Sequence, residues 1–397
     1  MANVLCVFEN IIATVAVTEK FFRELSEYDK RIAVKYLSVA QVKKRDVEWC
    51  DILYMIRPNN AVFARLAKVA HRCGITVAFY LDDDLSMLPE GSPNMPWRKK
   101  GLALSAKNVD MIVSPSPYIC KRYGDKYGVT KRVIIDTPVP KEEINKHTDG
   151  RNDQIKIVYA AGLGHKPLFD KFIRPVLSEL SACYSDRVSL TFMGVHPDIH
   201  PNDYEMSISF IPPMSLEEYR KTIADENFDI GLAPLVTDEF TKCKYFNKFI
   251  EYAMFGIVGL YSNTEPYTFV IKDKENGLLV GDKPEEWLEA IGYAVDHHDV
   301  ITKCRNGAYD TLKLKFDPKL IMDGFIAEIP ELVEPHKNRS MRGNTIGFIK
   351  MQYLISRCGD WIYKTIFYFK RGEISEVKEG IKRKINTIRV EKSTMRT

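Results

Sequence analysis

Short apolar runs alternate with helical patterns along most of this chain, and this alternation restricts the possible fold more than any other feature. Helical patterns such as Ala61–Cys73 and Tyr118–Tyr127 lie between the runs. Strands that alternate with helices form right-handed βαβ crossovers and a parallel sheet, so residues 1–140 are expected to form a Rossmann-like domain. Its strands are expected at Val4–Phe8, Ile32–Leu37, Ile52–Ile56, Ile75–Tyr80, Met111–Val113 and Val133–Ile135.

The same alternation occurs again after residue 153. Residues 141–153 are rich in charge and include Gly150, so they are expected to form a linker. The predicted α/β organisation is two Rossmann-like domains, 1–140 and 154–335, that face a central cleft, followed by a helical tail at 336–397. Such a cleft suits a reaction with one substrate on each domain. The second set of strands is expected at Ile155–Ala160, Val188–Phe192, Ile208–Ile211, Phe228–Leu232, Ile257–Tyr261 and Leu278–Val280, with helices at Leu168–Ala182, Leu216–Ala224, Lys244–Phe255 and Glu285–Val295.

The composition is that of a globular protein, since 45% of the 397 residues are apolar and 28% are charged. Eight cysteines are scattered without a C-x-x-C pair, which favours reduced thiols and a cytoplasmic location. We recognise no signal peptide at the N-terminus. No uncharged run approaches the roughly 20 residues needed to span a bilayer.

Charge is distributed unevenly along the chain. Residues 336–397 contain fifteen Lys or Arg and five Asp or Glu, so this tail carries +10 and the rest of the chain −6. A basic tail favours anionic surfaces, either lipid headgroups or nucleic acid. Because no nucleic-acid recognition module is visible, a lipid surface is the expected partner and nucleic acid is not.

The segment Lys244–Phe255 combines an apolar stripe with a charged face. The helical phase places Lys244, Lys248 and Glu251 together, opposite the apolar side chains. Two cations suit a diphosphate, and a carboxylate suits paired sugar hydroxyls. The alternative is a solvated helix face with an ion pair three residues apart. The apolar stripe consists of Phe246, Phe249, Ile250, Ala253 and Met254.

Around this helix the chain resembles the group 1 (family 4) glycosyltransferases. The resemblance implies the two-domain GT-B fold and transfer of a sugar from a nucleotide-diphosphate sugar to a hydroxyl, with retention of configuration and no bound metal. It implies that Lys248 meets the diphosphate, Glu251 the ribose hydroxyls, and Lys244 the phosphates or donor sugar. The matching residues are Pro234, Leu235, Phe240, Lys244, Lys248, Glu251, Tyr252, Gly256, Pro266, Tyr267, Asn276, Gly277 and Leu278.

The chain departs from this family at two positions. The commonest members carry a first glutamate eight residues before the second, and Cys243 stands there in this chain. Tyr245 replaces a serine that often contacts phosphate in the family. The missing glutamate leaves open a second function, a non-catalytic nucleotide-sugar or glycan-binding protein on a GT-B scaffold.

Two further segments are expected on the donor side. Gly162, Gly164, His165 and Lys166 follow the first strand of the second domain, where glycines allow close approach and His165 can meet phosphate. The loop with Asn263, Thr264 and Glu265 is expected to open a short helix whose backbone N–H groups attract phosphate, or else to be an ordinary capped turn. By the resemblance, Tyr252 is also assigned to the donor site.

Charged residues follow two strands of the first domain. Asp82, Asp83 and Asp84 are expected to face an acceptor; as a D-x-D pattern, Asp82 and Asp84 are alternatively ligands for a divalent metal. Arg57 is expected in the same cleft, or else paired with a carboxylate such as Asp82. The candidate catalytic residues are Lys248, Glu251, His165 and Asp82, and no metal cofactor is expected.

The tail has a basic stripe in which Lys350, Arg357, Lys364 and Arg371 recur every seven residues. It is expected either to lie on a membrane as an interfacial helix or to pack back on the domains, and Gly359 and Asp360 are expected to interrupt it. The apolar residues on its other faces are Ile349, Tyr353, Leu354, Trp361, Ile362, Ile366 and Phe369. The sequence therefore predicts a cytoplasmic glycosyltransferase of cell-surface polysaccharide synthesis, peripheral on the inner face of the membrane, with a glycan or lipid-linked acceptor.

Overall fold

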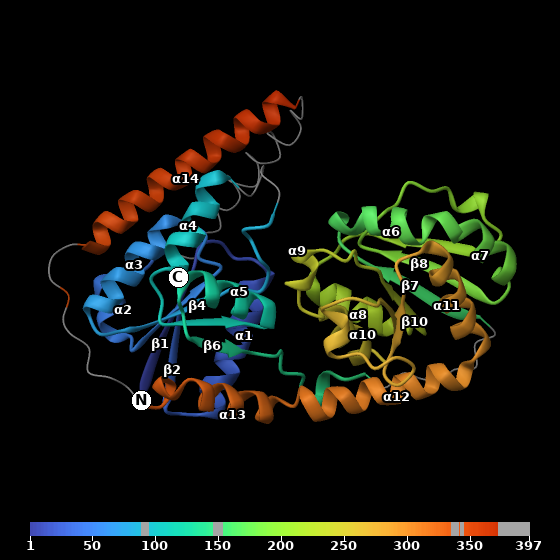
Figure 1. Cartoon of the computed structure of the whole chain (residues 1–397), viewed down its shortest axis with the longest axis horizontal. Coiled ribbons are helices and arrows are strands. Elements are labelled where there is room, and N and C mark those ends of the chain that lie inside the picture. The colour runs from blue at the N-terminus through green and yellow to red at the C-terminus, as the bar shows by residue number, and fades with distance from the viewer. Residues whose placement is uncertain (89–94, 146–153, 335–340, 342–344, 372–397) are drawn as a thin grey trace. The chain divides into compact units, whose positions relative to one another are not determined.

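The computed structural model describes residues 1–88, 95–145, 154–334, 341 and 345–371. The chain forms two compact units (Figure 1). Unit 1 comprises Met1–Ile134 together with Phe325–Thr397, and unit 2 comprises Ile135–Gly324.

Unit 1 is built on a parallel six-stranded sheet with the order β2-β1-β3-β4-β5-β6. Its central strand, β3, is buried at every residue, as expected for a parallel strand covered by helices on both faces. The side chain of Asn60 caps α3 by accepting a hydrogen bond from the Val62 amide. The strands are β1 Ala2–Phe8, β2 Ile32–Ser38, β3 Ile52–Ile56, β4 Thr76–Tyr80, β5 Met111–Ser114 and β6 Lys131–Ile134; the helices are α1 Ala13–Tyr28, α2 Lys44–Trp49, α3 Ala61–Arg72, α4 Pro96–Ala106, α5 Pro117–Tyr127 and α14 Thr345–Lys370, with a 3-10 turn η6 at Pro330–Leu332.

Unit 2 contains a second parallel sheet, with the order β12-β11-β10-β7-β8-β9. Its strands are β7 Ile155–Ala160, β8 Val188–Met193, β9 Ser207–Ile211, β10 Ile230–Ala233, β11 Val258–Ser262 and β12 Leu278–Val280. Its helices are α6 Lys166–Phe172, α7 Leu177–Tyr184, α8 Leu216–Glu226, α9 Glu239–Lys242, α10 Asn247–Met254, α11 Pro284–Asp296 and α12 His298–Lys315; its 3-10 turns are η1 Lys141–Glu143, η2 Leu163–His165, η3 Arg174–Val176, η4 Pro201–Asp203 and η5 Tyr267–Phe269. Each expected strand is present in both units, and the expected helix Leu168–Ala182 is divided by η3.

In each parallel sheet, successive strands are added first on one side of the first strand and then on its other side. In unit 1, β1 is followed by β2 on one side and by β3 on the other; in unit 2, β7 is followed by β8 on one side, and β10 pairs on the other. Open α/β sheets bind ligands at the carboxyl ends of the strands that flank such a switch point. The positions to inspect are therefore the ends of β1 and β3 in unit 1 and of β7 and β10 in unit 2.

The unit boundaries differ from those expected from the sequence. The Val139 amide donates to the Phe316 carbonyl at 2.8 Å, and the Asn145 amide donates to the Met254 carbonyl at 2.7 Å. The end of the expected first domain and the start of the expected linker are thus bonded to unit 2, while residues 146–153 lie outside the described residues. Helix α13, Pro318–Glu328, leads the chain back to unit 1, where the Phe325 ring lies 5.1 Å from that of Phe21.

Helix α14 packs on unit 1 and is continuous, so the expected interruption at Gly359 and Asp360 is wrong. Its buried face includes Ile346, Ile349 and Tyr353. Asp360 is buried as well, because it pairs with Arg98 of α4 and accepts a hydrogen bond from Trp97. An aspartate that looks unfavourable inside a helix is therefore used in tertiary packing.

A buried ion cluster connects α14 to the end of β1. The guanidinium of Arg98 bridges Glu9, which follows β1, and Asp360, and the three side chains are less than one-tenth exposed. Removing one partner of such a cluster leaves a buried charge uncompensated, at a cost of about 3–5 kcal/mol.

Among the described helices, none is both long enough and apolar enough to cross a bilayer.

Candidate active site

The switch point of unit 2 is open where the chain leaves β7. Gly162 and Gly164 are exposed, and a Cβ atom added to either would meet nothing within 4 Å. Packing within unit 2 therefore gives no steric reason for glycine at these positions. A residue of β7 stabilises this turn, because the Tyr159 hydroxyl donates a hydrogen bond to the His165 carbonyl at 2.9 Å. Lys166 begins α6 and is half-buried.

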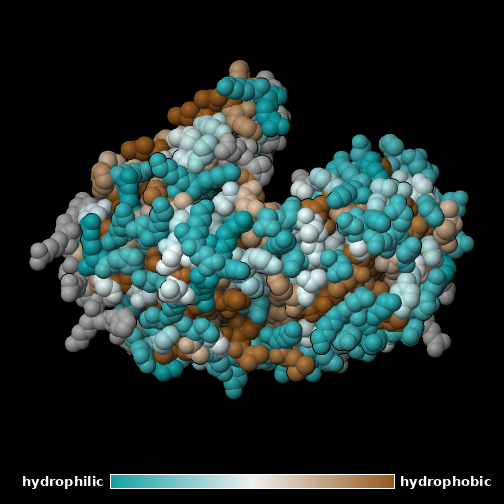
Figure 2. Space-filling view, in the orientation of Figure 1, coloured by the Kyte–Doolittle hydropathy of each residue, from teal (hydrophilic) through white to brown (hydrophobic). Residues whose placement is uncertain are grey.

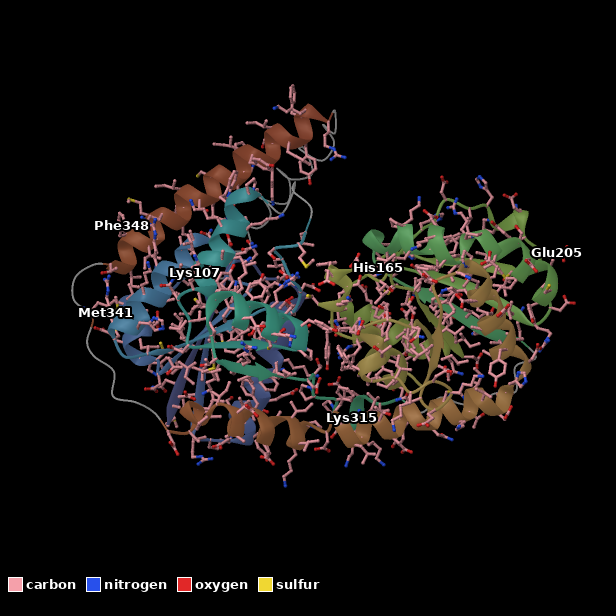
Figure 3. The ribbon with its side chains drawn as sticks, viewed as in Figure 1. Lys107, His165, Glu205, Lys315, Met341 and Phe348 are labelled. Carbon is pink, nitrogen blue, oxygen red and sulfur yellow. The ribbon has the colours of Figure 1, made fainter. Side chains whose placement is uncertain are left out.

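His165, labelled in Figure 3, shares this place with two lysines. Burial lowers the pKa of His165 from its ordinary 6.5, and the positive charges of Lys244 and Lys248 lower it further. The three side chains come from different segments, the turn after β7, the turn after α9 and helix α10. The fold thus gathers three basic groups at the switch point, which favours a multiply charged anion.

The expected helix Lys244–Phe255 begins later than predicted. Helix α10 starts at Asn247, and the Lys244 amide donates to the Thr241 carbonyl in the preceding turn. Lys244 is therefore not on the same helix face as Lys248, although the charges of both lysines lower the pKa of His165. Its ammonium lies 4.7 Å from the centre of the Phe240 ring. The predicted apolar stripe is buried, as the helical phase indicated.

Glu251 accepts hydrogen bonds from two sides. Lys248 Nζ lies 2.7 Å from Glu251 Oε1, and both side chains are about one-quarter exposed. The hydroxyl of Tyr219, on α8, also donates to Glu251 Oε1. Burial and the nearby Glu251 charge raise the pKa of Tyr219 far above its ordinary 10, so the phenol remains a donor. The ion pair considered from the sequence is present, but it belongs to a network that includes a second helix.

Sequence reasoning did not single out Tyr219. An aromatic residue one turn into an amphipathic helix is typical of core packing, and nothing local indicates a carboxylate partner 32 residues away. The capping box formed by Ser215 and Glu218 does show where α8 begins.

The assignment of Tyr252 to the donor site is wrong. Its side chain is fully buried, and its hydroxyl donates to the Leu232 carbonyl at 3.0 Å. A Cβ atom on Gly231 would lie 2.4 Å from the Tyr252 ring, so this ring fills the space above β10. Tyr252 therefore fastens α10 to the sheet and does not reach a ligand.

The loop after β11 differs from the expected phosphate-binding helix start. The Asn263 amide donates to the Val280 carbonyl and the Thr264 amide to the Ser262 carbonyl, both at 2.7 Å, and only the short 3-10 turn η5 follows. These two amides are used within the fold. Thr264 is buried, and no partner for its hydroxyl is found among the described residues; Glu265 is partly exposed.

Ser262 performs a positioning role that the sequence did not suggest. Its hydroxyl accepts from the Leu235 amide at 2.8 Å and donates to the Leu235 carbonyl at 3.0 Å. The segment after β10, which includes Pro234, is thereby held against the end of β11. Cys243 is buried, so no side chain reaches solvent where the family carries its first glutamate.

In unit 1, the three aspartates after β4 have different surroundings. Arg57 donates to Asp82 and to Asp83, and the Thr14 hydroxyl donates to Asp82 at 2.7 Å. Arg57 has a backbone φ of 47°, which is uncommon for a residue with a side chain. The ion pair of Arg57 with Asp82, considered as an alternative from the sequence, is present, and both side chains remain about one-quarter exposed.

The assignment of Asp84 to the acceptor side is wrong. Asp84 is fully buried and accepts hydrogen bonds from Ser86, from the Tyr123 hydroxyl at 2.7 Å and from Arg122. Its partners differ from those of Asp82, so the two carboxylates do not converge on one ligand. Of the four residues placed on the acceptor side, Arg57, Asp82 and Asp83 remain accessible.

Comparison with known proteins finds similarity at the level of the fold and none at the level of sequence families. No family model and no curated protein sequence matches the chain. Among solved structures, HepE from Anabaena in complex with UDP and glucose is 12% identical, with a TM-score of 0.61 over 83% of this chain and 100% of HepE. The lipopolysaccharide outer core galactosyltransferase WaaB is 14% identical, with a TM-score of 0.58 over 83% and 99%. Sucrose-phosphate synthase from Thermosynechococcus elongatus is 10% identical, with a TM-score of 0.60 over 84% and 100%.

The chain has the GT-B fold. The two Rossmann-like domains expected from the sequence are confirmed. The structural similarity supports the architecture, but at identities of 10–14% it does not establish an activity, so the function must be argued from the residues at the switch points.

Proposed function

We propose that this GT-B protein transfers a sugar from a nucleoside-diphosphate sugar to a hydroxyl acceptor. The observation that carries the proposal is the group of His165, Lys244 and Lys248 at the switch point of unit 2, with Glu251 beside them. Three basic groups match a diphosphate, and one carboxylate matches the paired hydroxyls of a ribose. The UDP and glucose in the HepE complex make a UDP-sugar the first donor to test.

The proposed roles follow from where charge develops. When the bond between sugar and diphosphate breaks, negative charge accumulates on the leaving diphosphate. Lys248 and Lys244, already placed at the site, then stabilise the transition state more than the bound donor. Glu251 would accept hydrogen bonds from the ribose hydroxyls while the Tyr219 hydroxyl holds its carboxylate in place.

The acceptor is assigned to unit 1 by the same reasoning. The end of β4 presents Asp82 and Asp83, carboxylates that can accept hydrogen bonds from acceptor hydroxyls, and Arg57 orients them. A glycan or lipid-linked acceptor in cell-surface polysaccharide synthesis fits a carboxylate-lined site of this kind. A cytoplasmic setting, retention of configuration and independence from a bound metal are parts of this proposal.

A second candidate function rests on Cys243. Because a buried thiol occupies the place of the first family glutamate, the chain could bind a nucleotide sugar without transferring it. The two functions differ in whether the donor is consumed.

A panel of UDP-, GDP- and TDP-sugars tests both. Binding is measured by calorimetry, and release of the nucleoside diphosphate is followed in the absence of acceptor, where a transferase hydrolyses its donor slowly. Binding with release supports transfer, and NMR of a product formed with a simple glycoside acceptor gives the anomeric configuration. Binding without release, also in the presence of acceptors, favours the second candidate. No binding of any donor contradicts the site itself.

A further inference from the structure

Helix α14 presents a second apolar face, opposite to the one that packs on unit 1. Ile346, Ile349 and Tyr353 are buried, and the helical phase places the exposed apolar residues on the other side of the helix. We name these residues the outer face: Phe348, Met351, Leu354, Ile355, Cys358, Ile362, Ile366 and Phe369. In Figure 2, brown atoms gather along α14, and Phe348, labelled in Figure 3, belongs to this face.

The exposure of the outer face is unusual for a soluble surface. Its large apolar side chains are between 49% and 70% exposed, and they continue over the length of the helix. Scattered apolar residues need no explanation, but a continuous apolar band marks an interaction site. Trp361, on its border, is 43% exposed, and tryptophan prefers the boundary between headgroups and acyl chains.

Charge at this helix favours an anionic partner. Lys350, Arg357 and Lys364 lie toward the packed face, where Arg357 also contacts Glu9, whereas Lys370 and Arg371 are exposed at the end of the helix. Asp360 is the one acidic residue in the helix sequence, and it is buried against Arg98. A second copy of the chain would oppose these cations to identical cations, without carboxylates to pair with them.

We propose that the outer face of α14 inserts into the interfacial layer of a bilayer that contains anionic phospholipid. The apolar residues enter the boundary between headgroups and acyl chains, and Lys370 and Arg371 at the helix end contact lipid phosphates, as in interfacial amphipathic helices. This proposal is independent of sugar transfer, because it concerns a surface of unit 1 and is measured without a donor.

The attachment of α14 gives this surface a defined place in unit 1. Arg357 donates to the Asn10 side chain at 2.7 Å, and Arg98 joins Asp360 to Glu9. Residues Glu9 and Asn10 follow β1, at the switch point of the unit 1 sheet. Helix α14 is thereby fixed to the same carboxyl edge of the unit 1 sheet as the end of β4, where an acceptor is proposed to bind.

Vesicle flotation with the full chain tests the proposal, using phosphatidylcholine vesicles with and without phosphatidylglycerol. The test variant combines Ile355→Gln, Ile362→Gln and Phe369→Gln. The matched control combines Leu216→Gln, Leu314→Gln and Leu320→Gln, which replaces residues of similar exposure, 55–74%, on helices α8, α12 and α13. Because all six residues are exposed, both variants should fold, which circular dichroism checks.

We expect the wild type and the control to bind the anionic vesicles, more weakly at high salt, and the test variant to bind at least about tenfold less. Trp361 emission should shift to the blue on binding, and this shift should be lost in Trp361→Phe. Equal binding by the test variant, or no binding by the wild type, overturns the proposal. A wild-type dimer that the test variant converts to a monomer, without an effect of vesicles, would assign the outer face to a second copy and also overturn it.

Discussion

Lys248 Nζ lies 2.7 Å from Glu251 Oε1, one turn apart on α10, in a pair that remains about one-quarter exposed. An exposed ion pair of this kind contributes little to stability. Because the pair lies at the switch point of unit 2, beside His165 and Lys244, both charges can bind a ligand. The ammonium can contact a diphosphate, and the carboxylate can accept hydrogen bonds from ribose hydroxyls.

Glu251→Gln should chiefly weaken donor binding. The amide keeps the size and helix propensity of the side chain but loses the charge that strengthens hydrogen bonds to ribose. We expect the KM for the donor to rise about tenfold or more, with a smaller change in kcat. Steady-state kinetics with the best donor of the panel measures this. A fall in kcat at unchanged KM would contradict a ribose contact.

Tyr219→Phe should produce a weaker form of the same change. The ring and its packing stay, while Glu251 loses the hydroxyl that holds its carboxylate. One hydrogen bond of this kind is worth about 1 kcal/mol, so we expect a KM increase of about fivefold and a fall in melting temperature of no more than a few degrees. In Glu251→Gln, the further change Tyr219→Phe should add little. If the two effects multiply fully, Tyr219 does not act through Glu251.

The positions of the strands along the chain could be predicted from the sequence, whereas several side-chain environments could not. Apolar runs such as that of β3 are recognisable because a parallel strand is buried on both faces. Asp360 and Asp84 were misinterpreted because their partners, Arg98 and Tyr123, come from distant segments. Tyr252 was misassigned for a related reason, since local phase does not show that its hydroxyl reaches the Leu232 carbonyl.

The pKa of His165 should respond to the donor. Burial and two lysines lower it below the ordinary 6.5, so the imidazole is neutral at pH 7. Because the folded pKa is the lower one, His165 contributes stability above about pH 6.5 and loses it as the pH falls below that value. A bound diphosphate offsets the lysine charges and should raise the pKa. NMR titration with and without UDP, assigned through His165→Gln, measures the shift, and an unchanged pKa would place the diphosphate elsewhere.

Sugar transfer should persist in EDTA. The proposed site meets diphosphate charge with Lys244, Lys248 and His165, and the Asp82 carboxylate already accepts from Arg57 and Thr14. Donor turnover with and without chelator checks this. The prediction is contradicted if chelator abolishes activity and Mn²⁺ restores it. If Mn²⁺ then fails to restore activity in Asp82→Ala, Asp82 is a metal ligand.

The most direct test of the account compares Lys248→Ala with Lys303→Ala, which removes a lysine from the exposed surface of α12. If Lys248 stabilises charge on the leaving diphosphate, its loss should reduce kcat by about 30- to 1,000-fold, equivalent to roughly 2–4 kcal/mol, while Lys303→Ala keeps wild-type turnover. Both variants should fold, because neither side chain lies in the core. Wild-type donor affinity and turnover in a folded Lys248→Ala protein would reduce the pair with Glu251 to a surface ion pair and contradict the donor site.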